Sequence, residues 1–457
     1  MGEPAGYARD DELKRLGDED VALAVLDMVF STPDWVHRRG ETIVFVTDIQ
    51  LRRHVTLDLT VPNPCPASVD WFDGDPRRLI PVDILAKGSM VNFDCADEDG
   101  RPFPILSRRQ NGEIAWRAMV GYANDVLRQA GLPNLPPTGV ELLRQVTQEP
   151  PAAALEAYKT GESLRPDDRQ AAALFADPGF AASAWMLAHN FLLIGAVDAR
   201  PGERRILKHS FQEPRPSNDR RDRKDQFLEA FGWEPTTIEV NVPAFSDCES
   251  YHFEAVAPDG IEFVDIVLGD EDRVVDDGYD PTWALGYRRV ISESPDRAHL
   301  AVSRTSDSAA TQDQFLLPRV SIRLQVARAG WFSSALLASV FVALFLTVSY
   351  SHVAGFAQPP TGGATPRLNT DPAALMVALV GIATLAVVRT GEHVYTASRI
   401  RPLRWVALLS ALLPVAAAWL LVFPGPGDTL TQGWWRLCAV AWASAAILFV
   451  GWARRAT

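Results

Sequence analysis

The chain has few cysteines, and their spacing is unsuited to a shared site. It has four in 457 residues, with no CxxC pair, and Cys438 lies inside an apolar run. A zinc knuckle needs closely spaced cysteines, and four scattered cysteines, one of them inside an apolar run, do not suggest a disulfide framework. We therefore expect neither, and the pattern indicates a reducing compartment. Residues 1–20 are acidic and lack an apolar stretch, so we expect no secretory signal there.

Motifs of the common enzyme classes are also missing. The sequence contains no GxxxxGK[ST] phosphate-binding loop, no GxGxxG, no HExxH and no GxSxG. These are the signatures of nucleotide hydrolysis, dinucleotide binding, zinc proteolysis and serine hydrolysis. We therefore assign no catalytic residue and no cofactor, although an enzymatic role stays open.

Charge is distributed unevenly along the chain. The net charge is −13, but residues 330–457 contain eight Arg against three acidic residues, a net +5. The first 329 residues therefore carry −18. A region this acidic repels phosphate backbones, so nucleic acid is not an expected partner.

Four apolar runs occupy the C-terminal part of the chain, and none has an ionisable residue in its middle. A bilayer core of about 30 Å needs roughly 20 apolar residues in a helix. The sequence therefore predicts four transmembrane helices, at about 331–350, 372–390, 403–423 and 434–452. A transporter usually has an ionisable residue within its helix bundle, so the pattern disfavours an ion or proton pathway.

The orientation follows from the arginines that flank these runs. Nine Arg lie in the flanks on one side and two on the other. Because short cytoplasmic flanks are enriched in Arg and Lys, we expect a multi-pass protein of the cell membrane with both termini in the cytoplasm. The scarcity of Lys beside abundant Arg, Ala and Pro indicates a bacterial source.

The pattern of residues 1–328 predicts several domains, which together we call the head. Residues 1–133 combine helical and alternating patterns and predict a cytoplasmic α+β domain, and 134–192 predict a helical connector. Seven strand candidates within 193–328 predict a β-sandwich, which leads directly into the transmembrane domain at 329–457. The turn Pro258-Asp259-Gly260 is expected to join two of these strands as a hairpin.

Three histidines form a candidate metal site. His209, His252 and His299 fall on three different predicted strands, and neighbouring strands could bring them together as ligands. The alternative is that each makes ordinary hydrogen bonds on its own strand.

Two charged segments are better explained as surface loops than as ligand-binding sites. The acidic run from Asp270 to Asp280 could attract calcium, but its spacing fits no EF-hand loop. The segment Arg215–Lys224 alternates basic and acidic residues. Both are expected to be solvated surface loops.

Two stretches carry a resemblance to other proteins. Phe93–Asn111 (FDCADEDGRPFPILSRRQN) and Ser250–Gly260 (SYHFEAVAPDG) resemble segments of uncharacterised bacterial multi-pass membrane proteins, as does the block from Arg297 into the first apolar run. In that family an N-terminal α+β region and a β-sandwich precede C-terminal transmembrane helices. The resemblance implies this architecture and no known activity.

The leading functional hypothesis is a non-enzymatic, membrane-anchored sensor or scaffold with the bilayer and a protein as partners. It is motivated by the acidic head, the plain anchor and the missing motifs. A membrane-perturbing effector, for example in bacterial defence, is the alternative. A third hypothesis is a hydrolase or metal enzyme that uses the three histidines. A homo-oligomer is left open.

Overall fold

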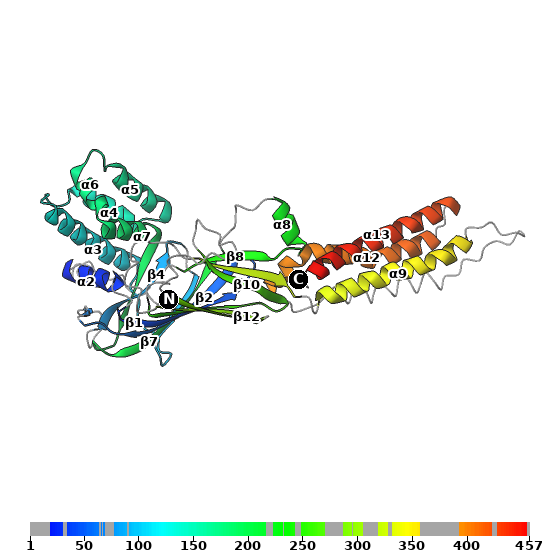
Figure 1. The fold of residues 1–457 in the computed structure, drawn as a ribbon, viewed down its shortest axis with the longest axis horizontal. Helices are drawn as coiled ribbons and strands as arrows, with labels where there is room; N and C mark the ends of the chain where they lie inside the picture. Colours follow the sequence, from blue (N-terminus) through cyan, green and yellow to red (C-terminus); the bar gives the residue numbers. More distant parts are fainter. Residues whose placement is uncertain are drawn as a thin grey trace, which may run out of the picture.

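A head of sheets and helices carries long apolar helices that extend away from it in one direction (Figure 1). The predicted order, a sheet-rich region followed by apolar helices, is confirmed. The computed structural model describes residues 19–30, 34–63, 65, 67–68, 77–88, 91–215, 223–231, 233–242, 248–269, 287–294, 296–304, 319–327, 331–356, 393–422 and 427–454.

The strands follow the apolar alternation of the sequence. In β2, every second side chain from Leu51 to Leu59 is buried, as the alternation predicts. The strands are β1 (Val36–Phe45), β2 (Gln50–Thr60), β3 (Ala67–Ser68), β4 (Arg77–Ala86), β5 (Val91–Ala96), β6 (Asn190–Val197), β7 (Arg204–Pro214), β8 (Thr236–Asn241), β9 (Ser250–Val256), β10 (Ile261–Gly269), β11 (Tyr287–Glu293), β12 (Arg297–Arg304) and β13 (Arg319–Val326).

The largest sheet joins strands from both ends of the head. Its order is β11-β12-β9-β1-β2-β7-β5, and its neighbours are antiparallel except for the parallel pair β1 and β9. β1, β2 and β5 come from the segment expected as a separate α+β domain, and the other four come from 193–328. The expected boundaries at residues 133 and 193 therefore do not divide this sheet.

The turn at Pro258–Gly260 does not form the predicted hairpin. β9, before the turn, belongs to the seven-stranded sheet, whereas β10, after it, belongs to a second sheet of order β10-β13-β8. Gly260 has φ +79°, which a glycine adopts without strain. The turn thus carries the chain from one sheet to the other.

The sheets are stacked in layers. The third sheet has the order β3-β4-β6. Apolar residues of all three sheets share one hydrophobic core, so the large sheet faces both small ones. Leu79, Leu192 and Ile194 project from the other face of β4 and β6 into a second core beneath the helices. Figure 1 shows these helices at the end of the head remote from the apolar bundle.

The helices of the head begin at residues that favour helix starts. Ser107 forms a capping box with Gln110 at the start of α3, and Asp177 caps α7. Pro137 and Pro151 start α4 and α5, where the missing N–H costs nothing. The helices are α2 (Glu19–Phe30), α3 (Arg108–Gln129), α4 (Pro137–Gln148), α5 (Pro151–Ser163), α6 (Arg169–Ala176), α7 (Pro178–His189) and α8 (Arg223–Ala230).

Three single helices of the described chain are long and apolar enough to cross a membrane. They belong to α9 (Ser333–Phe356), α12 (Arg401–Val422) and α13 (Gly427–Ala453), and a short helix, α11 (Val394–Arg399), precedes α12. The predicted span at 372–390 lies outside the described residues. The pair α6 and α7 would meet the same criterion together, but it bends by 89° and packs within the head.

The bundle of α9, α12 and α13 has its own core, and it exposes large apolar residues outward. Small side chains at Ala335, Ser339, Ala441 and Ala445 are buried, as expected for close helix contact. Trp434 is fully buried in this core, and its indole N–H donates to the carbonyl of Leu346 at 2.9 Å.

Candidate functional site

The structure brings two of the three candidate histidines together. His252 on β9 and His299 on β12 lie on neighbouring strands, with 3.3 Å between Nδ1 and Nε2 and stacked rings. Both lie on the face of the large sheet that points away from the shared core, since Tyr251 and Leu300 beside them are buried. Burial and the nearby Arg38 lower the pKa of His252, which favours a neutral ring.

His209 lies apart from this pair. It is on β7, three strands from β9, and its side chain points into the core, where Nε2 lies 2.8 Å from Asp83 Oδ2. Strands are about 4.8 Å apart, so the three rings do not surround one point. No group of three or more His, Cys, Asp or Glu side chains in the described ranges is placed to hold a metal ion.

The charged segments are largely outside the described residues. The acidic run from Asp270 to Asp280 lies there completely, and the basic segment is described only at Arg215, Arg223 and Lys224. Arg215 lies beside Tyr395 and Arg399, and burial together with the Arg399 charge lowers the pKa of Arg215. One end of the basic segment therefore lies at the base of the apolar helices.

Sequence reasoning missed a chain of buried ionic groups between the sheets. Arg39 links Asp83 to Glu41, with 2.7 Å from Nη2 to Asp83 Oδ1 and 2.6 Å from Nε to Glu41 Oε1. Arg53 Nη1 lies 2.6 Å from the second oxygen of Glu41. We call this set, which His209 and Glu213 complete at its two ends, the buried charge cluster.

A bulge in β4 positions the cluster. Between Pro81 and Asp83 the strand has one residue more than its partner β6, so Val82 and Asp83 both face the shared core. Without the bulge, Asp83 would point toward the helices. The sequence does contain a signal for the rest of the cluster, because Arg39, Glu41 and Arg53 occupy inward positions of alternating strands.

The cluster is charged in the fold. Burial alone would raise the pKa of Asp83, but the Arg39 guanidinium and the hydrogen bond from His209 outweigh it and hold that pKa well below its ordinary value. Burial likewise opposes ionisation of Glu41, and Arg39 and Arg53 overcome it and lower the pKa. Apart from the partly exposed Glu213, its side chains are closed off from solvent, and they connect β1, β2 and β7 of the large sheet to Asp83 on β4 of the third sheet.

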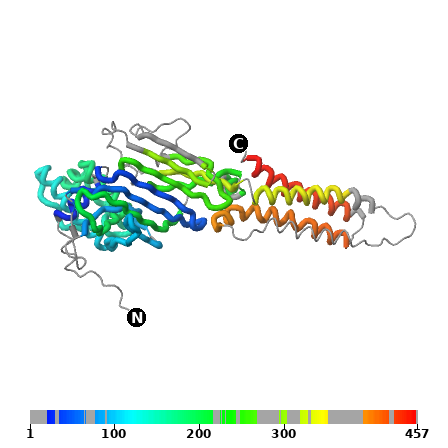
Figure 2. Tube along the Cα trace, turned by 90° about the horizontal axis from the view of Figure 1, so that it is seen from below, coloured from blue at the N-terminus to red at the C-terminus, as the bar shows by residue number. Residues whose placement is uncertain are grey.

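The base of the apolar bundle is built into the head. The hydrophobic core shared by the sheets continues through Phe332, which directly precedes α9, and through Ala335, Leu403 and Leu448 at the head ends of α9, α12 and α13. We call this region the junction. Figure 2 shows the bundle extending directly from the sheets. The sheets and the apolar helices therefore share packed side chains at the junction.

The short helix α11 is the central element of the junction. Tyr395 is 1% exposed, and its ring lies 4.9 Å from that of Phe45 at the end of β1. The Thr396 hydroxyl donates to the carbonyl of Asp259, at 2.7 Å, in the turn between the two sheets. α11 thus contacts the seven-stranded sheet and the turn that leads to the second one.

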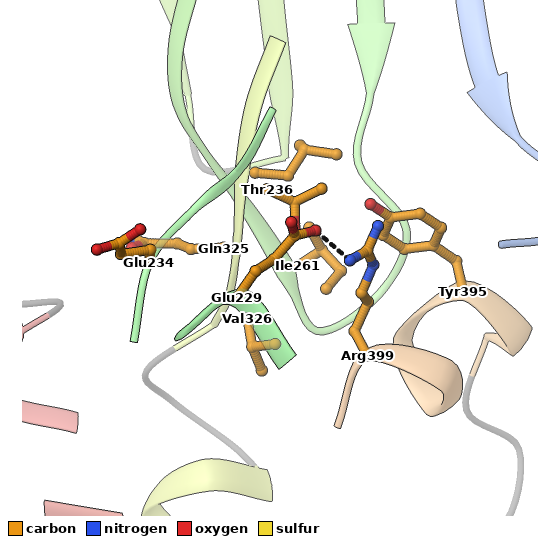
Figure 3. A pocket seen from close by; sticks show the side chains of 9 residues that line it. Glu229, Glu234, Thr236, Ile261, Gln325, Val326, Tyr395 and Arg399 are labelled. Atoms are coloured by element: carbon orange, nitrogen blue, oxygen red, sulfur yellow. Dashed lines mark hydrogen bonds and ion pairs between the residues drawn. The ribbon is translucent and has the colours of Figure 1, made fainter. Parts of the chain in front are cut away.

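An ion pair joins α11 to α8. Arg399 pairs with Glu229, and its guanidinium carbon lies 5.3 Å from the centre of the Tyr395 ring (Figure 3). These residues border a pocket between α8, α11 and the small sheet, where Glu234 and Gln325 add polar groups. Within this pocket the ion pair Glu229–Arg399 connects α8 to α11.

The segment after α8 holds the end of α13. The Trp233 indole N–H donates to the carbonyl of Ile447 at 3.4 Å. Gly451 allows close packing here, because a β-carbon would lie 2.9 Å from Phe332 Cζ and 3.2 Å from Trp233 Cδ1. The segment after α8 therefore contacts α13, in addition to the contacts that α11 makes at the junction.

No protein-family model matches the chain, and no curated protein matches it.

Proposed function

We propose that this protein is a non-enzymatic sensor or scaffold whose cytoplasmic head is anchored by four transmembrane helices. Three apolar helices are in place, and the flanking arginines favour a cytoplasmic head. α9 ends far from the head (Figure 1), whereas α11 packs against the head through Tyr395 and Thr396, and the run at 372–390 between the two helices has the length of a span.

The observation that carries the proposal is the shared core at the junction. An anchor that only retains a protein at the membrane needs no packing against the head. Here Tyr395 is buried against Phe45, and the bundle residues Phe332 and Leu403 belong to the same core as the sheets. Binding of a partner to the head would therefore bias the positions of the helices, and helix movements would bias the head.

The coupling can be tested by hydrogen–deuterium exchange on the full-length protein in nanodiscs. We expect Tyr395→Ala to raise exchange in α11, at the end of β1 near Phe45, and in the first turn of α12. Tyr395→Phe, which keeps the ring, is the control and should leave exchange near wild type. A change confined to α11 would contradict coupling through the junction.

The partner can be sought by crosslinking in membranes, followed by purification of the full-length protein. If the protein is a sensor or scaffold, the same partner protein should be recovered in repeated experiments. The yield of that partner should differ between Tyr395→Ala and Tyr395→Phe. If no specific protein is recovered, the scaffold role fails.

The orientation has a separate test. A reporter fused to the C-terminus should be active when it requires the cytoplasm and silent when it requires the outside. The reverse result would overturn the proposed topology without bearing on the coupling.

A further inference from the structure

Three basic residues gather at the head ends of the apolar helices. Lys224 on α8, Arg401 at the start of α12 and Arg454 after α13 are all exposed. Arg454 also lies over the Trp233 ring, 6.0 Å from its centre. These cations belong to separate elements, so the fold assembles them.

Exposed apolar side chains accompany these cations. Phe227 on α8 is 53% exposed, Val394 on α11 is 57% exposed, and Trp405 near the start of α12 is 66% exposed. A mixture of aromatic or aliphatic side chains with Lys and Arg is typical of segments that lie at the boundary between headgroups and acyl chains.

α8 is attached to the head ends of the apolar helices. Glu229 on α8 pairs with Arg399, two residues before α12, and Trp233 hydrogen-bonds to Ile447 near the end of α13. Figure 1 shows α8 beside the head ends of α12 and α13. Its outward residues Lys224 and Phe227 are three apart, so they share one side of the helix.

We propose that these six residues form a binding surface for anionic phospholipid headgroups, with α8 lying in the membrane interface. Lys224, Arg401 and Arg454 would bind the lipid phosphates, and Phe227, Val394 and Trp405 would contact the upper acyl chains. The charge of this surface opposes that of the acidic head, so it attracts anionic lipid where the head as a whole repels it. The inference rests on the proposed membrane location and not on the sensing role.

The experiment titrates the full-length protein, in neutral detergent micelles, with phosphatidylglycerol or phosphatidylcholine and counts bound lipids by native mass spectrometry. We expect phosphatidylglycerol to bind more tightly. The double variant Lys224→Ala/Arg401→Ala should bind it more weakly, by roughly 5-fold for each cation removed, while phosphatidylcholine binding is unchanged. The control Lys159→Ala/Arg165→Ala removes two exposed cations, one on α5 and one just after it, far from the apolar helices, and should behave as wild type.

Phe227→Ala separates the apolar contribution from the charge. It should weaken binding of both lipids, because it removes acyl-chain contact and leaves the cations in place. Glycerol 3-phosphate, the soluble headgroup analogue, should not compete at matched concentration.

The proposed lipid-binding surface would be wrong if the double variant and its control lost phosphatidylglycerol binding equally. It would also be wrong if the wild-type protein bound the two lipids with equal affinity. Effective competition by glycerol 3-phosphate would also overturn it, in favour of a site for free phosphate. Release of the protein from membranes by alkaline carbonate would instead refute the membrane location itself, so the two failures can be told apart.

Discussion

The Tyr395 ring lies 4.9 Å from the Phe45 ring, which connects a six-residue helix beside the apolar bundle to the first strand of the head. The two residues are 350 positions apart in the chain. This contact places α11 in the core that the three sheets share. The stability of the head and the packing of the bundle should therefore both depend on this contact.

Removal of the Tyr395 ring should destabilise the protein. Tyr395→Ala leaves a cavity in a fully buried site, and comparable truncations cost about 3–5 kcal/mol of unfolding free energy. Denaturation of the full-length protein in detergent would measure this loss. Tyr395→Phe should cost much less, and an equally large loss there would mean that the hydroxyl rather than the ring carries the contact.

The pair Glu229–Arg399 should show energetic coupling. A double-mutant cycle of Glu229→Gln and Arg399→Gln is expected to give about 1–2 kcal/mol, because both side chains are largely removed from solvent. The exposed pair Asp125–Arg128 is the control, and it should give under about 0.5 kcal/mol. Equal coupling in the two pairs would show that the junction pair is no more than a surface contact.

Removal of a carboxylate from the buried charge cluster should be costly. Asp83→Asn leaves Arg39 without its full partner and is expected to destabilise the head by about 3–5 kcal/mol. Asp99→Asn, at an exposed turn, should be close to neutral. Thermal unfolding of both variants would decide between these outcomes.

The cluster should also make the protein sensitive to acid. The folded pKa values of Asp83 and Glu41 lie below their ordinary values of 3.8 and 4.5, so the unfolded chain takes up protons first. Their contribution to stability is present above these ordinary values and is lost as the pH falls below them. In Asp83→Asn, the slope of unfolding free energy against pH in this range should be shallower than in wild type.

Lys87 should make stability rise with pH as well, but in the alkaline range. Burial, with help from the nearby Arg108, lowers its pKa from 10.5 to about 8, and Nζ donates to the carbonyl of Val146 at 2.6 Å. Between these pH values the unfolded chain holds the proton and the folded one does not, so stability from this residue rises with pH. Lys87→Met should abolish that rise, whereas Lys159→Met at the surface should preserve it.

Local patterns predicted much of the secondary structure. The alternation of Val55, Leu57 and Leu59 predicted β2, and the described strands β6 to β10 match expected segments closely. The apolar helices follow from length and composition, since a span needs an uninterrupted apolar run. β11 was not predicted.

Strand pairing could not be predicted in the same way. β1 pairs with β9, and Gly40 faces His252 across 212 positions of the chain. Backbone hydrogen bonds give no sequence signal of their partner, so the segments looked like separate domains. The same limit applies to Asp83, whose direction depends on a bulge opposite β6.

By itself, the sequence determined that apolar helices follow an acidic, sheet-rich region, because hydropathy and charge are properties of each segment. The tertiary structure alone decided that α11 is part of the core. The stretch around Tyr395 is polar and rich in arginine, without apolar periodicity. Its burial depends on Phe45, Asp259 and Glu229, which only the folded chain brings to the same place.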